Sequence, residues 1–429
     1  MAGDHHVYPF AIFMGTIWVL WLLRVMLARR YRPWRRRWVT TTSVIIPVVD
    51  EPMGLFRSVL ERISAQDPDQ IIVVVNGPRN PALELTCAGV NNVACYWTDV
   101  PGKRNALRIG LEKARGEIAV LVDSDTIWTD NTLDELVKPF RDPHVGGVTT
   151  RQRILEPGRS VLTRWADWLE SVRSEYSMPA MSVLGTVGCL PGRTIAFRTK
   201  ILRQVMDDFL HEPFLGFVLE VSDDRTLTNL TLKAGYRTVY QSTSLVYTDA
   251  PLRLRKLIKQ QLRWARGSQY NTLRMLPWMF RNARTLALFY ISDIMIPFML
   301  IAAFVSWTSN LAAGARADLY EPIPLPRGHM ALAVLVVLAF WMSVVSIGLR
   351  FGRHFAYQPF DVVFLPVFMI INSVLLMPIR ILGFFRMGHN SGWGTRASAF
   401  AGTQVQNPQA LIPYTLGTAM LALAVAVSL

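Results

Sequence analysis

The chain has 429 residues, of which 51% are hydrophobic, and a formal net charge of +14. This length favours more than one domain. The charge does not predict a nucleic-acid partner, because the arginines cluster beside an apolar run and no aromatic-interleaved motif accompanies them. Three cysteines are an odd and small number, which argues against a disulfide framework, so a reducing compartment fits better.

The first predicted element is an apolar run over residues 9–27, which is long enough to span a bilayer. Arginines gather directly after it, as expected on the cytosolic side of a membrane segment. A signal peptide would instead carry its charges before the apolar run and a small-residue cleavage site after it. We therefore expect residues 1–38 to form a permanent transmembrane anchor and a basic juxtamembrane segment.

Residues 39–275 alternate between short β-branched runs and helical stretches, which predicts an α/β domain with a mainly parallel sheet. The predicted strands cover 43–49, 70–75 and 117–122, and the predicted helices cover 54–65 and 104–114. Functional groups in such sheets lie at the carboxyl ends of strands. The polar residues expected to converge there are Asp50, Glu51, Asn76, Gly77, Asp123, Ser124 and Asp125.

Residues 276–429 are predicted to hold interfacial and transmembrane helices with a cytosolic loop between them. The preceding stretch 267–280, rich in Met, Leu, Trp and Arg, is expected to be interfacial. The membrane-helix candidates are 285–307, 329–349 and 410–429. Asp293 lies inside the first of them, where a carboxylate either lines a polar path or pairs with an arginine.

The apolar run 359–385 is a separate case, because Pro366 and Pro378 interrupt it and arginines flank it on both sides. Both flanks therefore appear cytosolic. We expect a re-entrant or interfacial hairpin, with its broken backbone shielded by protein or lining a cavity.

Two motifs suit a metal and a diphosphate. Asp123 and Asp125 end a buried strand and can hold a divalent cation together with a sugar diphosphate, although turns also use aspartate freely. Lys103 and Arg104 begin a predicted helix, where an anionic diphosphate binds well. The alternative for this pair is a solvated basic turn.

Two further motifs suit proton transfer and sugar binding. Asp223 and Asp224 begin a helix, so they either cap it or supply a general base that deprotonates an acceptor hydroxyl. Gln260, Arg263 and Trp264 combine an amide, a guanidinium that suits phosphate, and a flat indole that suits a sugar ring. A membrane-surface belt would explain the arginine and the tryptophan, but not the whole arrangement.

In chain order, these motifs resemble those of bacterial hyaluronan synthases and the chitin-oligosaccharide synthases of nodulating bacteria. These proteins are inverting family-2 glycosyltransferases related to cellulose synthase. The resemblance covers residues 40–275 and continues through Trp393, Gly394, Thr395 and Arg396. It implies a Rossmann-like GT-A domain, cytosolic and inserted between transmembrane helices.

The resemblance also implies roles for the matching residues. Asp123 and Asp125 would hold the nucleotide-sugar and its metal, Mg²⁺ or Mn²⁺, while Lys103 and Arg104 would contact the nucleotide or diphosphate. Asp224 would be the base, with Asp223 beside it. The remaining roles are diphosphate binding by Gln260 and Arg263, acceptor stacking by Trp264, and a loop closing over the nucleotide at Trp393, Gly394, Thr395 and Arg396.

Two departures from the family pattern concern the donor and the acceptor. Asn76 stands where the family usually has an aspartate that contacts uracil, and its carbonyl can still accept the ring N–H. In the acceptor segment 188–198, which contains Gly192, Arg193 replaces a residue that is typically neutral. We hypothesise that Arg193 recognises an anionic group such as a uronate. The alternative is an ion pair with a nearby acid.

The sequence thus predicts a processive polysaccharide synthase of the bacterial plasma membrane. It would polymerise an extracellular or capsular polysaccharide from UDP-sugars and pass it through its own helices. One alternative is a single-addition transferase acting on a membrane lipid. Another is a non-catalytic membrane partner with a decayed transferase domain, against which the intact Asp123, Asp125, Asp224 and Gln260–Trp264 motifs argue.

Overall fold

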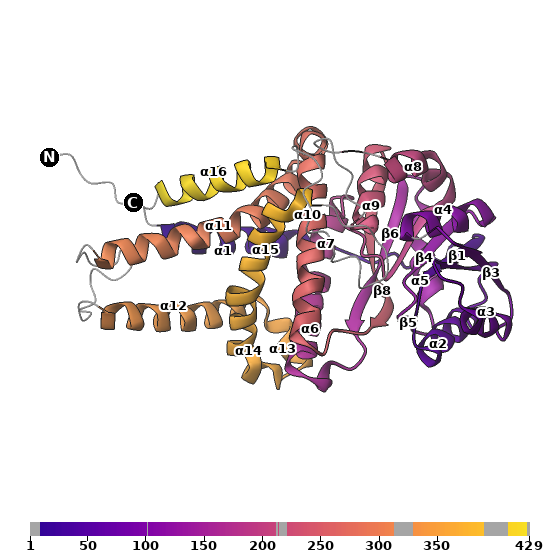
Figure 1. Cartoon of the computed structure of the whole chain (residues 1–429), viewed down its shortest axis with the longest axis horizontal. Helices are drawn as coiled ribbons and strands as arrows, with labels where there is room; N and C mark the ends of the chain where they lie inside the picture. Colours follow the sequence, from indigo (N-terminus) through magenta and orange to yellow (C-terminus); the bar gives the residue numbers. More distant parts are fainter. Residues whose placement is uncertain are drawn as a thin grey trace.

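The structure, a computed structural model, describes residues 9–100, 102–211, 213, 221–312, 329–389 and 411–426. An α/β domain forms one end of the molecule, and a set of long helices extends from it (Figure 1). The helices α10, α14 and α15 lie between the sheet domain and the ends of the other long helices (Figure 1).

The domain is built on an eight-stranded sheet in the order β3-β2-β1-β4-β7-β6-β8-β5. Strands β3, β2, β1 and β4 pair in parallel, as the alternating pattern predicts. The other half is mixed, because β7 runs antiparallel to both neighbours and β5 runs antiparallel to β8. The strands are β1 (Thr42–Val48), β2 (Gln70–Asn76), β3 (Val93–Thr98), β4 (Ile118–Val122), β5 (Thr126–Trp128), β6 (Val145–Ile154), β7 (Thr194–Arg198) and β8 (Arg237–Thr248).

Helices cover both faces of this sheet, and the side chains of each strand alternate between the two faces. Ile45 of β1 packs into the cluster that includes Leu107 of α4, whereas Val44 and Ile46 pack into the cluster that includes Phe56 of α2. The helices are α2 (Met53–Ser64), α3 (Pro81–Ala88), α4 (Lys103–Lys113), α5 (Thr132–Val137), α6 (Val161–Val172), α7 (Met178–Val183), α8 (Thr199–His211) and α9 (Asp223–Lys233), with a π-helical turn at Arg173–Ser177.

The remaining helices are α1 (Pro9–Arg29), α10 (Leu254–Asn282), α11 (Arg284–Ala312), α12 (His329–Arg350), α13 (Gly352–Tyr357), α14 (Asp361–Ile370), α15 (Met377–Phe385) and α16 (Ile412–Ala426). Within the described residues, three helical stretches are long and apolar enough to cross a membrane: Ala11–Arg29, Arg284–Ser306 and Asp361–Gly388. The stretches in α12 and α16 are apolar but shorter. The chain thus has the helices of a membrane protein.

The predicted hairpin over 359–385 is wrong. α14, a π-helical turn at Ile371–Leu376 and α15 follow one another without a reversal, and the apolar stretch runs from Asp361 to Gly388. A proline removes one helical hydrogen bond, but a wide turn can absorb that loss within a continuing helix. This helix lies crosswise to α1, α11, α12 and α16 and runs beside α10 (Figure 1).

The first helix belongs to the fold. α1 packs along α11 and against α7. Arg24 of α1 lies 3.4 Å from the carboxylate of Asp293 on α11. Of the two interpretations of Asp293, the structure therefore shows pairing with an arginine. Just after α1, the Tyr31 hydroxyl donates a 2.8 Å hydrogen bond to the carbonyl of Tyr240 in β8, which ties the helix to the sheet.

Candidate active site

The carboxyl ends of β2, β1 and β4 meet at one edge of the sheet, as predicted, because these strands are parallel neighbours. Ser124, after β4, donates a 2.9 Å hydrogen bond to Glu51, which follows β1. Asn76 ends β2, and its amide donates to the carbonyl of Val48 at 3.2 Å. Its side-chain oxygen accepts a longer 3.4 Å bond from the backbone of Gly102, just before α4. The strand ends are therefore linked to each other and to the start of α4.

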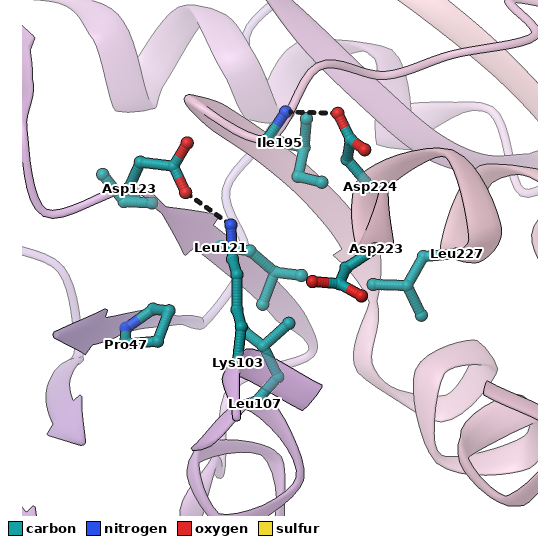
Figure 2. Close-up of a pocket in the computed structure, with 11 residues that line it drawn as sticks. Pro47, Lys103, Leu107, Leu121, Asp123, Ile195, Asp223, Asp224 and Leu227 are labelled. Carbon is teal, nitrogen blue, oxygen red and sulfur yellow. Dashed lines mark hydrogen bonds and ion pairs between the residues drawn. The ribbon is translucent and has the colours of Figure 1, made fainter. Parts of the chain in front are cut away.

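The two basic residues that begin α4 have separate acidic partners. Lys103 extends to Asp123, with 2.5 Å between Nζ and Oδ1 (Figure 2). Burial lowers the pKa of Lys103, but the carboxylates of Asp123, Asp223 and Asp224 outweigh it, so the net pKa is raised. Arg104 pairs with Asp223 at 2.8 Å, and both side chains are less than a tenth exposed. Lys103 therefore points into the site, whereas Arg104 is committed to a buried ion pair.

Asp224 is held by two backbone donors. Its carboxylate accepts a 3.1 Å bond from the amide of Gly192 and a 2.8 Å bond from the amide of Arg225. Burial raises its pKa, and the positive charge of Lys103 opposes that rise only in part. A carboxylate with a raised pKa is a stronger proton acceptor than an ordinary one. Asp224 is therefore suited to general-base chemistry.

These groups surround one recess, which we call the carboxylate recess. Within it, Asp123 is joined to Lys103 and the Asp223 carboxylate points toward the Lys103 side chain, whereas Asp224 points to the backbone amide of Gly192 (Figure 2). A Cβ atom at Gly192 would lie 3.4 Å from the Cβ of Asp224 and 3.5 Å from Nζ of Lys103, so the glycine keeps the recess open. The lining residues are Pro47, Lys103, Leu107, Leu121, Val122, Asp123, Gly192, Ile195, Asp223, Asp224 and Leu227.

The carboxylates after β4 fit a divalent metal in part. Asp123 and Asp125 are able to supply two carboxylates, and Mg²⁺ commonly takes only one or two carboxylates and fills the rest of its shell with phosphate oxygens and water. Within the described residues, no three His, Cys, Asp or Glu side chains form a larger ligand set. A metal here would thus need a diphosphate to complete its coordination.

A second recess, which we call the tryptophan recess, lies beside the first. Gln260 and Trp264 of α10 line it together with Arg193. Gly192 lines the carboxylate recess and Arg193 lines the tryptophan recess, so the backbone at residues 192–193 lies between them. This backbone is held in place by a 3.1 Å hydrogen bond from the amide of Asp123 to the carbonyl of Arg193. The other lining residues are Ile154, Trp165, Ala166, Leu169, Glu170, Asp249, Ala250, Pro251, Leu257 and Gln261.

Arg193 forms the ion pair that was the alternative to uronate recognition. Its Nη1 donates to Glu170 at 2.7 Å and to Gln152 at 2.8 Å. Sequence reasoning missed both partners, because Glu170 lies in an ordinary amphipathic helix, α6, and Gln152 lies in a strand without a motif. The proximity of Arg193 to helix 161–172 becomes visible only in three dimensions.

The structure does not bring every predicted residue to a recess. In the described part of the chain, Arg263 lies half-buried on α10 but lines neither recess. The predicted loop residues Trp393, Gly394, Thr395 and Arg396 lie outside the described residues. Just before them, the buried Arg266 of α10 donates a 2.8 Å bond to the carbonyl of Arg386, which joins α10 to the end of α15.

Comparison with known proteins identifies the class. Among solved structures, a mannosyltransferase from Pyrobaculum calidifontis in complex with GDP-Man and Mn²⁺ has the same fold, with a TM-score of 0.59 and 18% identity, covering 85% of this chain and 96% of that one. The fold is therefore that of a GT-A glycosyltransferase. Residues 40–267, more than half of the chain, match the model of the glycosyltransferase-like family 2. The chain belongs to this family and is a hexosyltransferase.

Two curated relatives extend the similarity beyond the α/β domain. Hyaluronan synthase of Streptococcus pyogenes is 26% identical over 366 residues, or 82% of this chain and 83% of the relative. An N-acetylglucosaminyltransferase of Rhizobium meliloti is 26% identical over 381 residues, or 86% of this chain and 84% of the relative. Both alignments are longer than the family domain, so they include part of the apolar helices.

Proposed function

We propose that this enzyme is a processive, inverting polysaccharide synthase that uses one or more UDP-sugars. The observation that carries the proposal is the position of Asp224, a buried carboxylate with a raised pKa that lies beside Lys103. Asp224 accepts a hydrogen bond from the amide of Gly192, and the next residue, Arg193, lines the tryptophan recess. The name of the relative hyaluronan synthase supports polymer synthesis as the reaction class, and that of the relative N-acetylglucosaminyltransferase supports transfer of an amino sugar. Their alignments over most of the chain support one activity that uses both the domain and the helices.

In the proposed reaction, Asp224 removes the proton from an acceptor hydroxyl. The resulting oxygen attacks the anomeric carbon of the donor from the face opposite the diphosphate, which inverts the configuration. Lys103 keeps its positive charge next to Asp123 and faces the departing diphosphate. Arg104 acts indirectly, because its pair with Asp223 fixes the start of α9 on which Asp224 lies.

Asp123 and Asp125 would hold Mg²⁺ or Mn²⁺, which would neutralise charge on the donor diphosphate. Gln260 and Arg263 would bind the leaving group, with the loop at 393–396 closing over the nucleotide. Asn76 would contact the nucleobase. Because its side chain already bonds to Val48 and Gly102, this contact needs the second lone pair of its oxygen or a small rearrangement.

The acceptor chain would lie in the tryptophan recess, with a sugar ring against Trp264 and with Gly192 and Arg193 beside it. α10 carries Trp264 and packs against α11 and α15, so the product would leave next to the apolar helices. Export through these helices is part of the proposal. So is a location in the bacterial plasma membrane, with the α/β domain in the cytosol, which the arginines after α1 support.

The test uses the purified full-length chain in lipid nanodiscs with a panel of UDP- and GDP-sugars, alone and in pairs, and measures nucleotide release. We expect release from one UDP-sugar or one pair, loss of release with EDTA, and recovery with Mg²⁺ or Mn²⁺. Asp224→Asn should lower the rate by roughly 10²–10⁴-fold. Absence of turnover with every donor, or full turnover by Asp224→Asn, would contradict the proposed chemistry.

A further inference from the structure

The first turn of α9, which carries the proposed base Asp224, is poorly stabilised by its own sequence. Ser222 precedes this turn with a left-handed φ of +65°, and its side chain makes no capping hydrogen bond. A left-handed backbone is unfavourable for a residue with a Cβ atom, and a missing cap weakens the start of a helix. The position of Asp224 therefore depends on contacts from outside α9.

Arg225, the residue after the proposed base, makes such contacts. Its buried guanidinium bonds to the hydroxyls of Ser268 and Thr272 on α10, with 2.6 Å between Nη2 and the Thr272 oxygen. The two hydroxyls are one helical turn apart, so they lie on the same face of α10 and the guanidinium fork spans them. The guanidinium carbon also lies 4.2 Å from the centre of the Tyr290 ring on α11, which is a cation–π distance. Arg225 thus joins the start of α9 to α10 and α11.

Arg225 is a buried cation whose partners are neutral groups. Within the described residues, no carboxylate forms an ion pair with the guanidinium, and its Nε has no hydrogen-bond partner. Burial of a charge without a counter-charge is unfavourable. The fold therefore gains little stability from this charge, and what the arginine supplies is a fixed geometry.

The side chain of Arg225 can act on Asp224 through the backbone. The Arg225 amide donates a 2.8 Å bond to the Asp224 carboxylate, so a shift of residue 225 would move one of the two donors that hold the base. The second donor is the amide of Gly192. Tyr290 restrains the segment that leads to it, because a Cβ atom added at Gly188 would lie 2.2 Å from the Tyr290 hydroxyl. Both donors thus belong to segments that contact Tyr290.

The same helix α10 carries the residues proposed to bind the acceptor and the leaving group. The two hydroxyls that hold the guanidinium lie one and two turns after Trp264. A further buried bond joins the helices nearby, because the side-chain amide of Asn229 in α9 donates to the side-chain oxygen of Asn271 in α10 at 3.1 Å. The start of α9 is therefore fixed relative to the helix that would hold the acceptor.

We propose that Arg225 is a positioning residue that ties the base Asp224 to α10 and α11 and so holds the carboxylate at the acceptor hydroxyl. This inference rests on the proposed function, because it requires Asp224 to act as the base. In this role Arg225 needs no contact with the substrate and transfers no proton.

The experiment measures thermal unfolding and the steady-state kinetics of nucleotide release by the full-length chain in nanodiscs. Arg225→Met keeps an apolar side chain of similar length and removes the buried charge, so the unfolding temperature should not fall. Its kcat should fall at least about tenfold while the donor KM stays within about twofold, because the donor site around Lys103 and Asp123 is intact. Arg225→Lys can still bond to one hydroxyl and should retain more of kcat than Arg225→Met.

A second comparison shows whether the loss passes through the base. In the Asp224→Asn background, Arg225→Met should lower the residual rate by less than about twofold, because the group that it positions is already lost. Arg198→Met is the matched control. Arg198 is similarly buried, but it bonds to the carbonyls of Val145 and Phe140 at 2.9 Å and 2.6 Å. Any effect of this control on the rate should be the same with and without the Asp224 carboxylate.

The double variant Ser268→Ala with Thr272→Val removes the hydroxyls that hold the guanidinium and should reproduce the loss of kcat. It decides the matter if Arg225→Met does not fold. A normal kcat in folded Arg225→Met, or an equal loss in both backgrounds, would overturn the inference and leave the proposed function standing. Full turnover by Asp224→Asn would instead contradict the proposed chemistry, and the inference would fail with it.

Discussion

Asp223 and Asp224 are adjacent in sequence, but their environments differ. Asp223 forms a buried pair with Arg104, and both of these side chains are less than a tenth exposed. Asp224 accepts bonds from backbone amides and has a pKa raised by burial. The resemblance named Asp224 as the base with Asp223 beside it, but the ion pair of Asp223 was not predicted, because its partner lies more than a hundred positions away in α4.

Because of this difference, we expect Asp223→Asn to lower the stability of the fold and Asp224→Asn to abolish turnover without lowering stability. Asp223→Asn leaves the buried charge of Arg104 without its counter-charge and should cost about 3–5 kcal/mol of unfolding free energy. Asp224→Asn removes a carboxylate that burial disfavours, so its unfolding temperature should be unchanged or higher while turnover is lost. Thermal unfolding and nucleotide release, measured side by side, check this. Equal unfolding temperatures for the two variants would contradict the assignment.

Lys103 should set the pH dependence of turnover. Its positive charge holds the pKa of Asp224 down against the effect of burial. In Lys103→Gln that pKa should rise further, so the base is protonated at a higher pH and the acidic limb of the rate profile moves to higher pH. Lys113→Gln, on the exposed end of the same helix, is the matched control. A limb that stays in place or moves to lower pH would argue against Asp224 as the base.

At the scale of elements, sequence periodicity predicted the parallel part of the sheet well. Strands β1, β2 and β4 and helices α2 and α4 each begin and end within one residue of the predicted bounds. These elements are buried on both faces or strongly amphipathic, so the hydrophobic pattern of each one is contained in its own short stretch of sequence. The antiparallel strand β7 was not predicted as such, because its place between β4 and β6 depends on long-range pairing.

The hairpin prediction failed for a related reason. Prolines at 366 and 378 signal a break in a helix, but they do not say whether the chain then reverses. Packing against α10 supports a continuous helix instead. At Gly383 of α15, an added Cβ would lie 2.7 Å from the Cβ of Ala265 in α10, so the two helices are in direct contact there.

Close contact between α10 and α15 predicts that Gly383→Ala is harmful. The added methyl group must push the helices apart, which typically costs about 1–3 kcal/mol. It should also weaken the bond from Arg266 to the carbonyl of Arg386 and lower nucleotide release. Gly15→Ala is the control and should be neutral, because Gly15 is an exposed position of α1 and nothing lies within 4 Å of the added Cβ. Wild-type stability and turnover for Gly383→Ala would show that this packing is not needed.

At the scale of the whole molecule, composition and charge predicted an α/β domain between apolar helices. The arrangement of those helices was not predictable, because hydropathy gives the length of a segment and not its direction. α10 and the α14–α15 helix lie crosswise to the other apolar helices, between them and the sheet domain (Figure 1). Trp264 therefore lies on a helix that joins the two parts of the molecule.

That arrangement is the basis for proposing a synthase rather than a single-addition transferase. An acceptor against Trp264 would be close to both the proposed base Asp224 and the apolar helices, so the product would stay bound between additions. The motif Gln260–Trp264 alone would be compatible with either activity. Its position on α10 favours repeated addition.

The most direct test of this account is the length of the product made at a low ratio of enzyme to acceptor. The purified chain in lipid nanodiscs is supplied with the donor or donor pair that supports nucleotide release, and early products are sized by gel and mass analysis. The account predicts long polysaccharide while most acceptor remains unextended. A single sugar added to each acceptor or lipid, with no longer product at any time, would contradict it.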